Sequence, residues 1–212
     1  MDYRQAANEQ KYDFAASIYD TIAFILSLGQ ANKIYRKIAD KIDINSSRKI
    51  VELGCGPASV MPYIVEYTRK STQIVGVDFS SKMIEIANRK KENNNWINVE
   101  FECMDMYEFP ENKDVDTVIF CLALTAIPHA TKALEKALAI LQPGGKLIII
   151  DSIPLNSKWW HPFTNTYIYL KSLLVGAKPT RKILSFIHEK MVDIQIEEML
   201  YGVYTVITAR KS

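Results

Sequence analysis

The feature that most constrains the fold is an alternation of two patterns between Lys49 and Ile150. Short runs rich in β-branched residues alternate with longer segments of helical periodicity, which is typical of a parallel sheet covered by helices. The sequence predicts strands near 49–53, 73–78, 99–103, 117–122 and 146–151. Helices are predicted near 60–67, 82–93 and 131–141. The last helix ends at Pro143-Gly144-Gly145, because proline cannot continue a helix and glycine permits the turn.

The segments on either side of this alternation complete an α/β domain. Residues 12–42 are predicted to be helical and to cap the sheet, since apolar residues recur there at three-to-four spacing. Residues 159–187 are also predicted to be helical. Residues 192–200 and 203–208 form two strands that must be antiparallel, because so short a joint leaves no room for a crossover. We interpret 1–212 as a single domain with a cap (1–45), a core (49–151), a helical insert (152–190) and a terminal strand pair (192–211).

Composition excludes several classes of protein. The 212 residues are 24% charged and 48% hydrophobic, which disfavours disordered, collagen-like and disulfide-scaffold proteins. A net charge of +2 gives no argument for nucleic-acid binding. The three cysteines lie far apart without a C-x-x-C pair, which favours a reducing, cytoplasmic setting and predicts no metal site. No apolar run approaches the roughly 18 residues of a membrane span.

The most specific motif is a glycine loop, Glu52-Leu53-Gly54-Cys55-Gly56, between the first predicted strand and the first helix of the core. Paired glycines let the backbone turn sharply and approach a ligand closely. Asp78 ends the second predicted strand, where a carboxylate can accept hydrogen bonds from both hydroxyls of a ribose. Asp105 follows the third strand. All three loops fall at the carboxyl ends of parallel strands, the edge where open α/β sheets bind ligands.

The order and spacing of these pieces resemble the class I S-adenosylmethionine-dependent methyltransferases over about 49–151. The resemblance implies a Rossmann-like sheet of seven mostly parallel strands, with an antiparallel last strand and helices on both faces. It also implies S-adenosylmethionine as the cofactor, with Glu52, Gly54, Cys55 and Gly56 around its methionine part and Asp78 on its ribose. Many members carry a third glycine where this chain has Ala58. The remaining cofactor-binding residues that the resemblance implies are Phe79, Met83, Met104, Asp105, Met106 and Cys121.

Other interpretations of the same residues remain open. A nicotinamide-dependent oxidoreductase also uses a glycine loop and a ribose carboxylate, but its G-x-G-x-x-G pattern would need glycine at Ser59. A non-catalytic binding module on the same fold is a third option. Asp78 could act only as an acid at a helix start, and the three methionines could be core filler. Cys55 is expected to offer its backbone N–H rather than a nucleophilic thiol.

Methyl transfer from a sulfonium is an in-line displacement, so a base is needed only when the acceptor must lose a proton. Candidate catalytic residues are His129, which follows the fourth strand, and His161, which lies in the insert. The resemblance adds Tyr19 of the N-terminal helix, near the cofactor. For His129, a position at a helix start is an equally good interpretation.

The sequence favours a small or lipophilic acceptor. The Asn/Asp-Pro-Pro-Tyr-type motif of the family's nucleic-acid enzymes is replaced by 121–124, which argues against a nucleic-acid partner. Residues 152–188 hold five Lys and Arg and no Asp or Glu. Within them, 158–182 carry an apolar stripe (Phe163, Tyr167, Leu170 and Leu174) beside a basic flank. Such a segment can lie on an anionic membrane, shape an acceptor pocket, or simply cover the sheet.

The placement of this insert resembles quinone-biosynthesis C-methyltransferases and soluble bacterial phospholipid N-methyltransferases. That resemblance implies that the N-terminal helix and the insert form the acceptor site, and that the acceptor is quinone-precursor-like or phospholipid-like. A soluble small molecule or natural product is the alternative acceptor.

Overall fold

The computed structural model describes residues 29–212 of the chain. They belong to two compact units, Met1–Phe109 and Pro110–Ser212, and each unit is described by itself. Most of the helix predicted over 12–42, including Tyr19, lies outside the described residues. Its described part contains α3, Ala31–Asp40. The single-domain interpretation stays a prediction.

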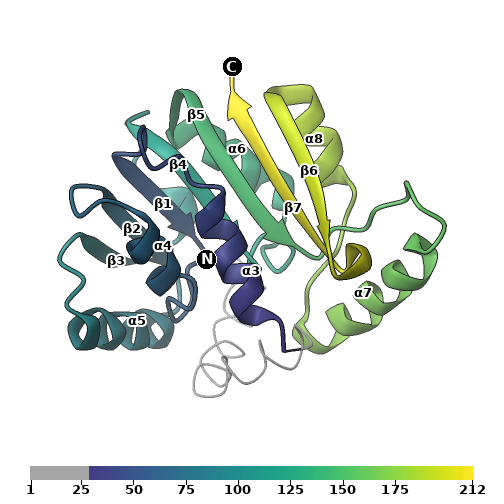
Figure 1. Ribbon diagram of the computed structural model, residues 1–212, viewed down its shortest axis with the longest axis horizontal. Coiled ribbons are helices and arrows are strands. Elements are labelled where there is room, and N and C mark those ends of the chain that lie inside the picture. Colours follow the sequence, from purple (N-terminus) through teal and green to yellow (C-terminus); the bar gives the residue numbers. More distant parts are fainter. Residues whose placement is uncertain (1–28) are drawn as a thin grey trace. The chain divides into compact units, whose positions relative to one another are not determined.

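The first unit is built on three parallel strands in the order β3-β2-β1 (Figure 1). Its strands are β1 (Lys49–Leu53), β2 (Gln73–Asp78) and β3 (Val99–Cys103). Besides α3, its helices are α4 (Met61–Tyr67), α5 (Ser81–Asn94) and the short 3₁₀ turn η1 (Met106–Glu108). β1 and β2 are buried along almost their whole length, as expected of parallel strands whose two faces are both covered.

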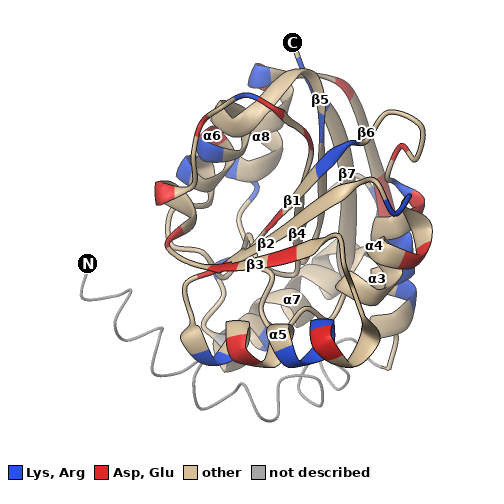
Figure 2. Ribbon diagram, turned by 90° about the vertical axis from the view of Figure 1, so that its left-hand side faces the viewer, with Lys and Arg blue, Asp and Glu red and all other residues tan. Residues whose placement is uncertain are grey.

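Local sequence explains why α5 begins and ends where it does. The Ser80 hydroxyl oxygen accepts a hydrogen bond from the Met83 N–H at 3.3 Å and caps the helix start. Asn95, with φ of +51°, takes the left-handed conformation that ends it. In Figure 2 the ribbon of α5 is marked by several acidic and basic residues, consistent with a solvated outer face. Helix α5 begins three residues after Asp78, the last residue of β2. The short connection between them is therefore held by a strand on one side and a helix on the other.

The second unit contains β4 (Val115–Cys121), β5 (Leu141–Asp151), β6 (Met191–Met199) and β7 (Tyr204–Lys211), in the order β4-β5-β7-β6. Its helices are α6 (Ala130–Ile140), α7 (His161–Val175), α8 (Lys182–Lys190) and the 3₁₀ turn η2 (Leu200–Gly202). β4 and β5 are parallel, whereas β7 runs antiparallel to both β5 and β6. The predicted terminal hairpin is therefore confirmed. Taken together, the strand order is β3-β2-β1-β4-β5-β7-β6, which confirms the predicted fold class.

The structure corrects the helix predicted over 159–187. It consists of two helices, because Gly176 takes a left-handed conformation (φ +71°) that ends α7, and α8 begins only at Lys182. The turn expected near Pro143 is present, with φ of +72° at Gly144. There the β4–β5 register shifts, since Val115 pairs with Leu141 and Thr117 already pairs with Lys146.

Helix α7 turns its apolar stripe outward. Phe163, Leu170 and Leu174 of the predicted stripe are exposed, whereas Tyr167 is half-buried. The buried positions of α7 include His161, Ile168, Lys171 and Ser172, of which only Ile168 is apolar. This arrangement is the reverse of an ordinary cover helix. Among residues 29–212, no helix is long and apolar enough to cross a membrane.

Candidate cofactor and acceptor sites

The glycine loop of the first unit is tied to the end of β2 by backbone hydrogen bonds. The N–H groups of Gly54 and Cys55 both donate to the Val77 carbonyl oxygen, at 2.8 and 3.0 Å. Gly54 and Gly56 have φ of +73° and +51°, in the left-handed region that favours glycine. The Gly56 N–H donates to Asp78 Oδ2 at 2.8 Å. The predicted loop and the predicted ribose carboxylate are thus side by side.

Asp78 is held by the backbone on both carboxylate oxygens. Besides the Gly56 N–H on Oδ2, Oδ1 accepts the Ser80 N–H at 3.0 Å. Burial raises the pKa of Asp78, and the N–H groups of Ser80, Gly56 and Phe79 oppose that rise. A carboxylate fixed in this way is oriented in advance for donors such as ribose hydroxyls.

Glu52 is a buried carboxyl group beside the glycine loop. It is only 2% exposed, and its Oε2 finds no hydrogen-bond partner within the described part of the chain. Burial, and secondly the negative charge of Asp78, raises the pKa of Glu52 well above its ordinary value. A buried acceptor without a partner calls for a donor that the protein does not supply. S-adenosylmethionine carries an ammonium group and two ribose hydroxyls, so Glu52 and Asp78 fit this cofactor.

The residues predicted around the adenine occupy two adjoining loops. The Met104 N–H donates to the Asp78 carbonyl oxygen at 3.1 Å, which brings the loop after β3 next to the loop after β2. Asp105 Oδ1 accepts the Tyr107 N–H at 3.1 Å and caps η1. Phe79 is half-buried and Met106 is buried. Met83 is 1% exposed, which supports the core-filler interpretation for that side chain.

Two smaller residues of the loop can be judged from their geometry. Ala58 stands where many family members have a third glycine, and it takes φ of +59°, a conformation that glycine adopts without strain. The Cys55 thiol is buried, and its pKa is raised mainly by burial and then by the charge of Asp78. A thiol of this kind is no nucleophile at neutral pH. The Cys55 N–H is used within the protein by the Val77 carbonyl oxygen, so its role as a backbone donor to the cofactor stays a prediction.

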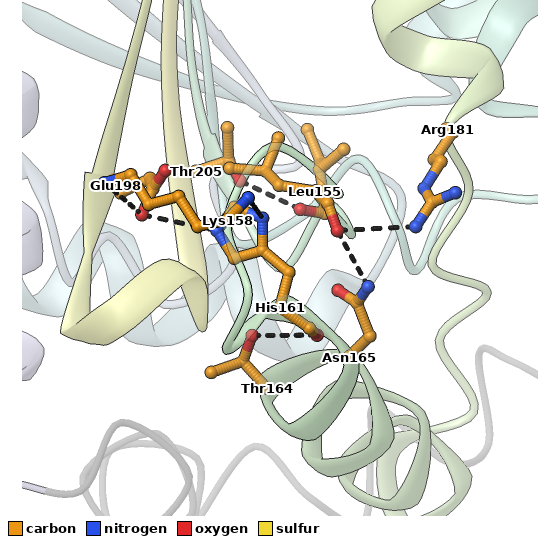
Figure 3. A network of polar contacts seen from close by, with 9 residues as sticks. Leu155, Lys158, His161, Thr164, Asn165, Arg181, Glu198 and Thr205 are labelled. Carbon is orange, nitrogen blue, oxygen red and sulfur yellow. Dashed lines mark hydrogen bonds and ion pairs between the residues drawn. The ribbon is translucent and has the colours of Figure 1, made fainter.

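In the second unit, the buried His161 is part of a polar network (Figure 3). Its Nδ1 accepts the Lys158 N–H at 3.1 Å, and its Nε2 lies 3.4 Å from Glu198 Oε2. Lys158 Nζ reaches the same Glu198 oxygen at 3.2 Å. A Cβ on Gly202 would lie 3.2 Å from Nε2, so the backbone also closes over the ring. His161 joins the start of α7 to β6, and we expect it to position these elements.

The rest of this network fixes the segment that leads into α7. Asn165 Nδ2 donates to the Leu155 carbonyl oxygen at 2.7 Å, and Arg181 reaches the same oxygen at 3.3 Å (Figure 3). The Thr205 hydroxyl donates to the Ile153 carbonyl oxygen at 2.8 Å. His129, by contrast, is an exposed residue at the start of α6 with φ of +65°. That position matches the helix-start interpretation, and the catalytic role of His129 stays a prediction, as does that of Tyr19.

A second polar cluster, which the sequence did not predict, lies where β5 ends and β7 begins. We call it the Lys171 cluster; it consists of Thr125, Asp151, Ser152, Lys171 and Tyr204, all of them buried. Lys171 Nζ donates to Ser152 Oγ at 2.8 Å and to Tyr204 Oη at 2.9 Å. Asp151 accepts the Thr125 N–H at 2.9 Å, the Thr125 hydroxyl at 2.7 Å and the Ser152 N–H at 2.7 Å. Burial raises the pKa of the Tyr204 phenol, and Tyr167, Asp151 and Cys121 add to this rise, which places Cys121 near the cluster.

Comparison with known proteins shows the family of this chain. Residues 44–190 match a family described as "Methyltransferase domain". The chain belongs to this family. This confirms the predictions of an enzyme and of a class I S-adenosylmethionine-dependent methyltransferase. The oxidoreductase and binding-module alternatives are thereby set aside.

Several similar proteins are named for the methylation of quinone precursors. A demethylmenaquinone methyltransferase of Streptomyces griseus is 27% identical over 176 residues, 82% of this chain and 70% of the relative. One from Paenarthrobacter aurescens is 27% identical over 157 residues, and the match spans 72% of this chain but only 58% of that relative. A ubiquinone/menaquinone biosynthesis C-methyltransferase UbiE of Geobacter sp. is 23% identical and covers 88% of this chain and 81% of its own length.

Solved structures share the fold. Geranyl diphosphate C-methyltransferase from Streptomyces coelicolor has a TM-score of 0.67 at 13% identity, covering 86% of this chain and 76% of its own. The [4+2]-cyclase SpnF has a TM-score of 0.70 at 15% identity, covering 95% of this chain and 94% of its own. A cyclase and a methyltransferase thus share this architecture. The structural similarity therefore shows the fold of the chain and does not identify its acceptor.

Proposed function

We propose that this methyltransferase transfers a methyl group from S-adenosylmethionine to a ring carbon of a lipophilic quinol of the demethylmenaquinol type. The relatives named for demethylmenaquinone and for quinone-biosynthesis C-methylation support this acceptor. The observation that carries the proposal is the apolar outer surface of α7, which suits an acceptor with a hydrocarbon tail.

In this proposal the first unit holds the cofactor, whose sulfonium supplies the methyl group. Asp78 accepts hydrogen bonds from the ribose hydroxyls, in an orientation set by the N–H groups of Gly56 and Ser80. Glu52 Oε2, which has no hydrogen-bond partner within the described residues, accepts a hydrogen bond from the ammonium group of the methionine part. Gly54 and Gly56 keep side chains out of the loop so that the cofactor can approach the backbone.

The α7 surface, which we define as Trp159, Phe163, Leu170, Leu173 and Leu174, supports contact with a bilayer. Each of these residues is between 61% and 80% exposed. Such an apolar patch is unusual for a protein that meets only water. Its flanks are basic, with the exposed residues Lys158, Lys178, Arg181 and Lys182 in an acid-free segment. Aromatic and leucine side chains beside Lys and Arg suit the interface of an anionic membrane.

The acceptor is tested by supplying labelled S-adenosylmethionine together with reduced demethylmenaquinone, phosphatidylethanolamine or the water-soluble fraction of a cell extract. We expect the label in the quinol, attached to a ring carbon. Label in phosphatidylethanolamine would establish the phospholipid alternative, and label in the soluble fraction would establish the small-molecule alternative. Either result would refute the proposed acceptor.

The membrane contact is tested by sedimentation with vesicles of phosphatidylcholine and phosphatidylglycerol at low and high salt. We expect the wild-type chain to bind, and the Leu173→Glu/Leu174→Glu variant to lose binding, because two charges would have to enter the apolar layer. Ile97→Glu is the matched control, since Ile97 is 82% exposed but belongs to the first unit. Equal binding of all three proteins would contradict a role for the α7 surface.

A further inference from the structure

Lys171 stands out because a buried lysine is rare unless it is paired. It is 9% exposed and lies on the protein-facing side of α7. Within the described part of the chain, Ser152 Oγ and Tyr204 Oη accept its hydrogen bonds, at 2.8 and 2.9 Å. An ammonium group has three protons to donate, and these two oxygens account for two of them.

The surroundings compensate the charge of Lys171 only weakly. Its Nζ lies 4.1 Å from the centre of the Tyr204 ring, and Asp151 is the acidic group that acts on it. The two oxygens of Asp151 already accept three hydrogen bonds, from Thr125 and Ser152. The other titratable groups around the cluster are Tyr167 and Cys121, both acting on Tyr204. Burial lowers the pKa of Lys171 to about 8, against the opposing effect of Asp151.

The cluster also lies at the edge of the strands where ligands bind. Asp151 is the last residue of β5, and β7 runs antiparallel to it, with Asp151 opposite Thr205. Tyr204, the first residue of β7, is therefore at the carboxyl end of β5. Thr125 follows the end of the parallel neighbour β4. Open α/β sheets bind their ligands at this edge, so the amine of Lys171 is at the right end of the sheet for chemistry.

We propose that Lys171 is a catalytic base, which takes the proton from the aromatic hydroxyl of the acceptor and then holds the resulting oxygen anion. Ser152 and Tyr204 position its amine. This inference rests on the proposed function, because it assumes an acceptor that bears a hydroxyl next to the carbon to be methylated.

The proposed reaction conserves atoms and charge. The neutral amine of Lys171 takes the hydroxyl proton, which leaves an ammonium and a phenolate-type anion. The electron pair of the adjacent ring carbon forms a bond to the methyl group, and the carbon–sulfur bond breaks with its pair going to sulfur. The ring carbon then loses its hydrogen as a proton to solvent. The ammonium of Lys171 returns its proton to the oxygen, and the products are the methylated quinol, S-adenosylhomocysteine and one proton.

The decisive experiment measures kcat/KM against pH for the wild-type chain and for Lys171→Met, with reduced demethylmenaquinone carrying a short prenyl tail. We expect the wild-type value to rise with pH and to level off above about 8, because the base must be neutral. Lys171→Met should lose about 100-fold and lose this rise, in line with general base catalysis. Tyr204→Phe should keep the rise but shift its midpoint. Lys132→Met, which removes an exposed lysine from α6, is the matched control and should behave like the wild type.

A binding measurement keeps the inference falsifiable even if the quinol is not turned over. The probe is 4-nitro-1-naphthol, whose absorbance reports the loss of its hydroxyl proton. We expect the wild-type chain to bind it as the anion, and Lys171→Met to bind it at least tenfold more weakly while keeping its affinity for S-adenosylhomocysteine. No methylation of the quinol by the wild type would refute the proposed function alone. Equal pH profiles, or equal affinity for the naphtholate, in wild type and Lys171→Met would overturn the role of Lys171.

Discussion

Replacing Lys171 with methionine should make the protein more stable at neutral pH, although it removes a residue that we propose for catalysis. The folded chain lowers the pKa of Lys171 from its ordinary 10.5 to about 8. This difference of 2.5 units corresponds to about 3 kcal/mol, which the folded state loses by carrying a buried ammonium at pH 7. The lost hydrogen bonds to Ser152 and Tyr204 return about 1 kcal/mol each in the opposite direction. Methionine fills a similar volume, so we expect a net gain of about 1 kcal/mol.

The pH dependence is the sharper part of this prediction. Below about 8 both the folded and the unfolded chain carry the proton, and above 10.5 neither does. Between these values the unfolded chain binds more protons, so the free energy of unfolding of the wild type rises with pH. From pH 7 to 9.5 the rise should be about 2 kcal/mol relative to Lys171→Met. Urea unfolding at four pH values in this range measures it, and the other titrating groups cancel in the comparison. A difference between the two proteins that does not change with pH would refute the reasoning.

Three further predictions concern the two sites and their supports. Asp78→Ala should weaken S-adenosylhomocysteine binding 10- to 100-fold, because losing hydrogen bonds to a charged group costs about 1.5–3 kcal/mol. Thermal shifts at several ligand concentrations measure this affinity. An unchanged affinity would contradict the assignment of Asp78 to the ribose. Gly76→Ala should destabilise the protein by about 1–3 kcal/mol in urea, because the new Cβ would lie 2.7 Å from the Phe101 ring. An unchanged free energy of unfolding would contradict this expectation. Glu198→Gln should cost about 1–3 kcal/mol, because Glu198 pairs with Lys158 and lies 3.4 Å from the buried His161 ring. Glu85→Gln, which breaks an exposed pair with Arg89, should cost less than about 1 kcal/mol. Equal costs would argue against a structural role for Glu198.

The parts of the molecule that the sequence predicted are those that local patterns determine. β1 and β2 are short, buried and β-branched, and the glycine loop, Asp78 and the terminal hairpin follow from turn residues at fixed positions. The sequence predicts a single helix over 159–187, whereas the structure has two. Gly176 followed by Pro179 is the sequence signal for the end of a helix.

The Lys171 cluster could not be predicted, because it depends on which face of α7 is buried. Sequence periodicity placed Phe163, Leu170 and Leu174 on one stripe correctly, but it assigned no environment to that stripe. The buried face is the polar one, and its partners Asp151 and Tyr204 are distant from Lys171 along the chain. The acid-free segment 152–188 was the available signal, since a lysine there has few acidic partners nearby.

The measurement that tests the central claim most directly is calorimetric titration of the wild-type chain with S-adenosylhomocysteine and, separately, with NAD. We expect one S-adenosylhomocysteine per chain and no heat from NAD, because the chain is a methyltransferase and we propose that the loop around Gly56, Glu52 and Asp78 holds its cofactor. Binding of NAD, or no binding of S-adenosylhomocysteine by a folded chain, would contradict it.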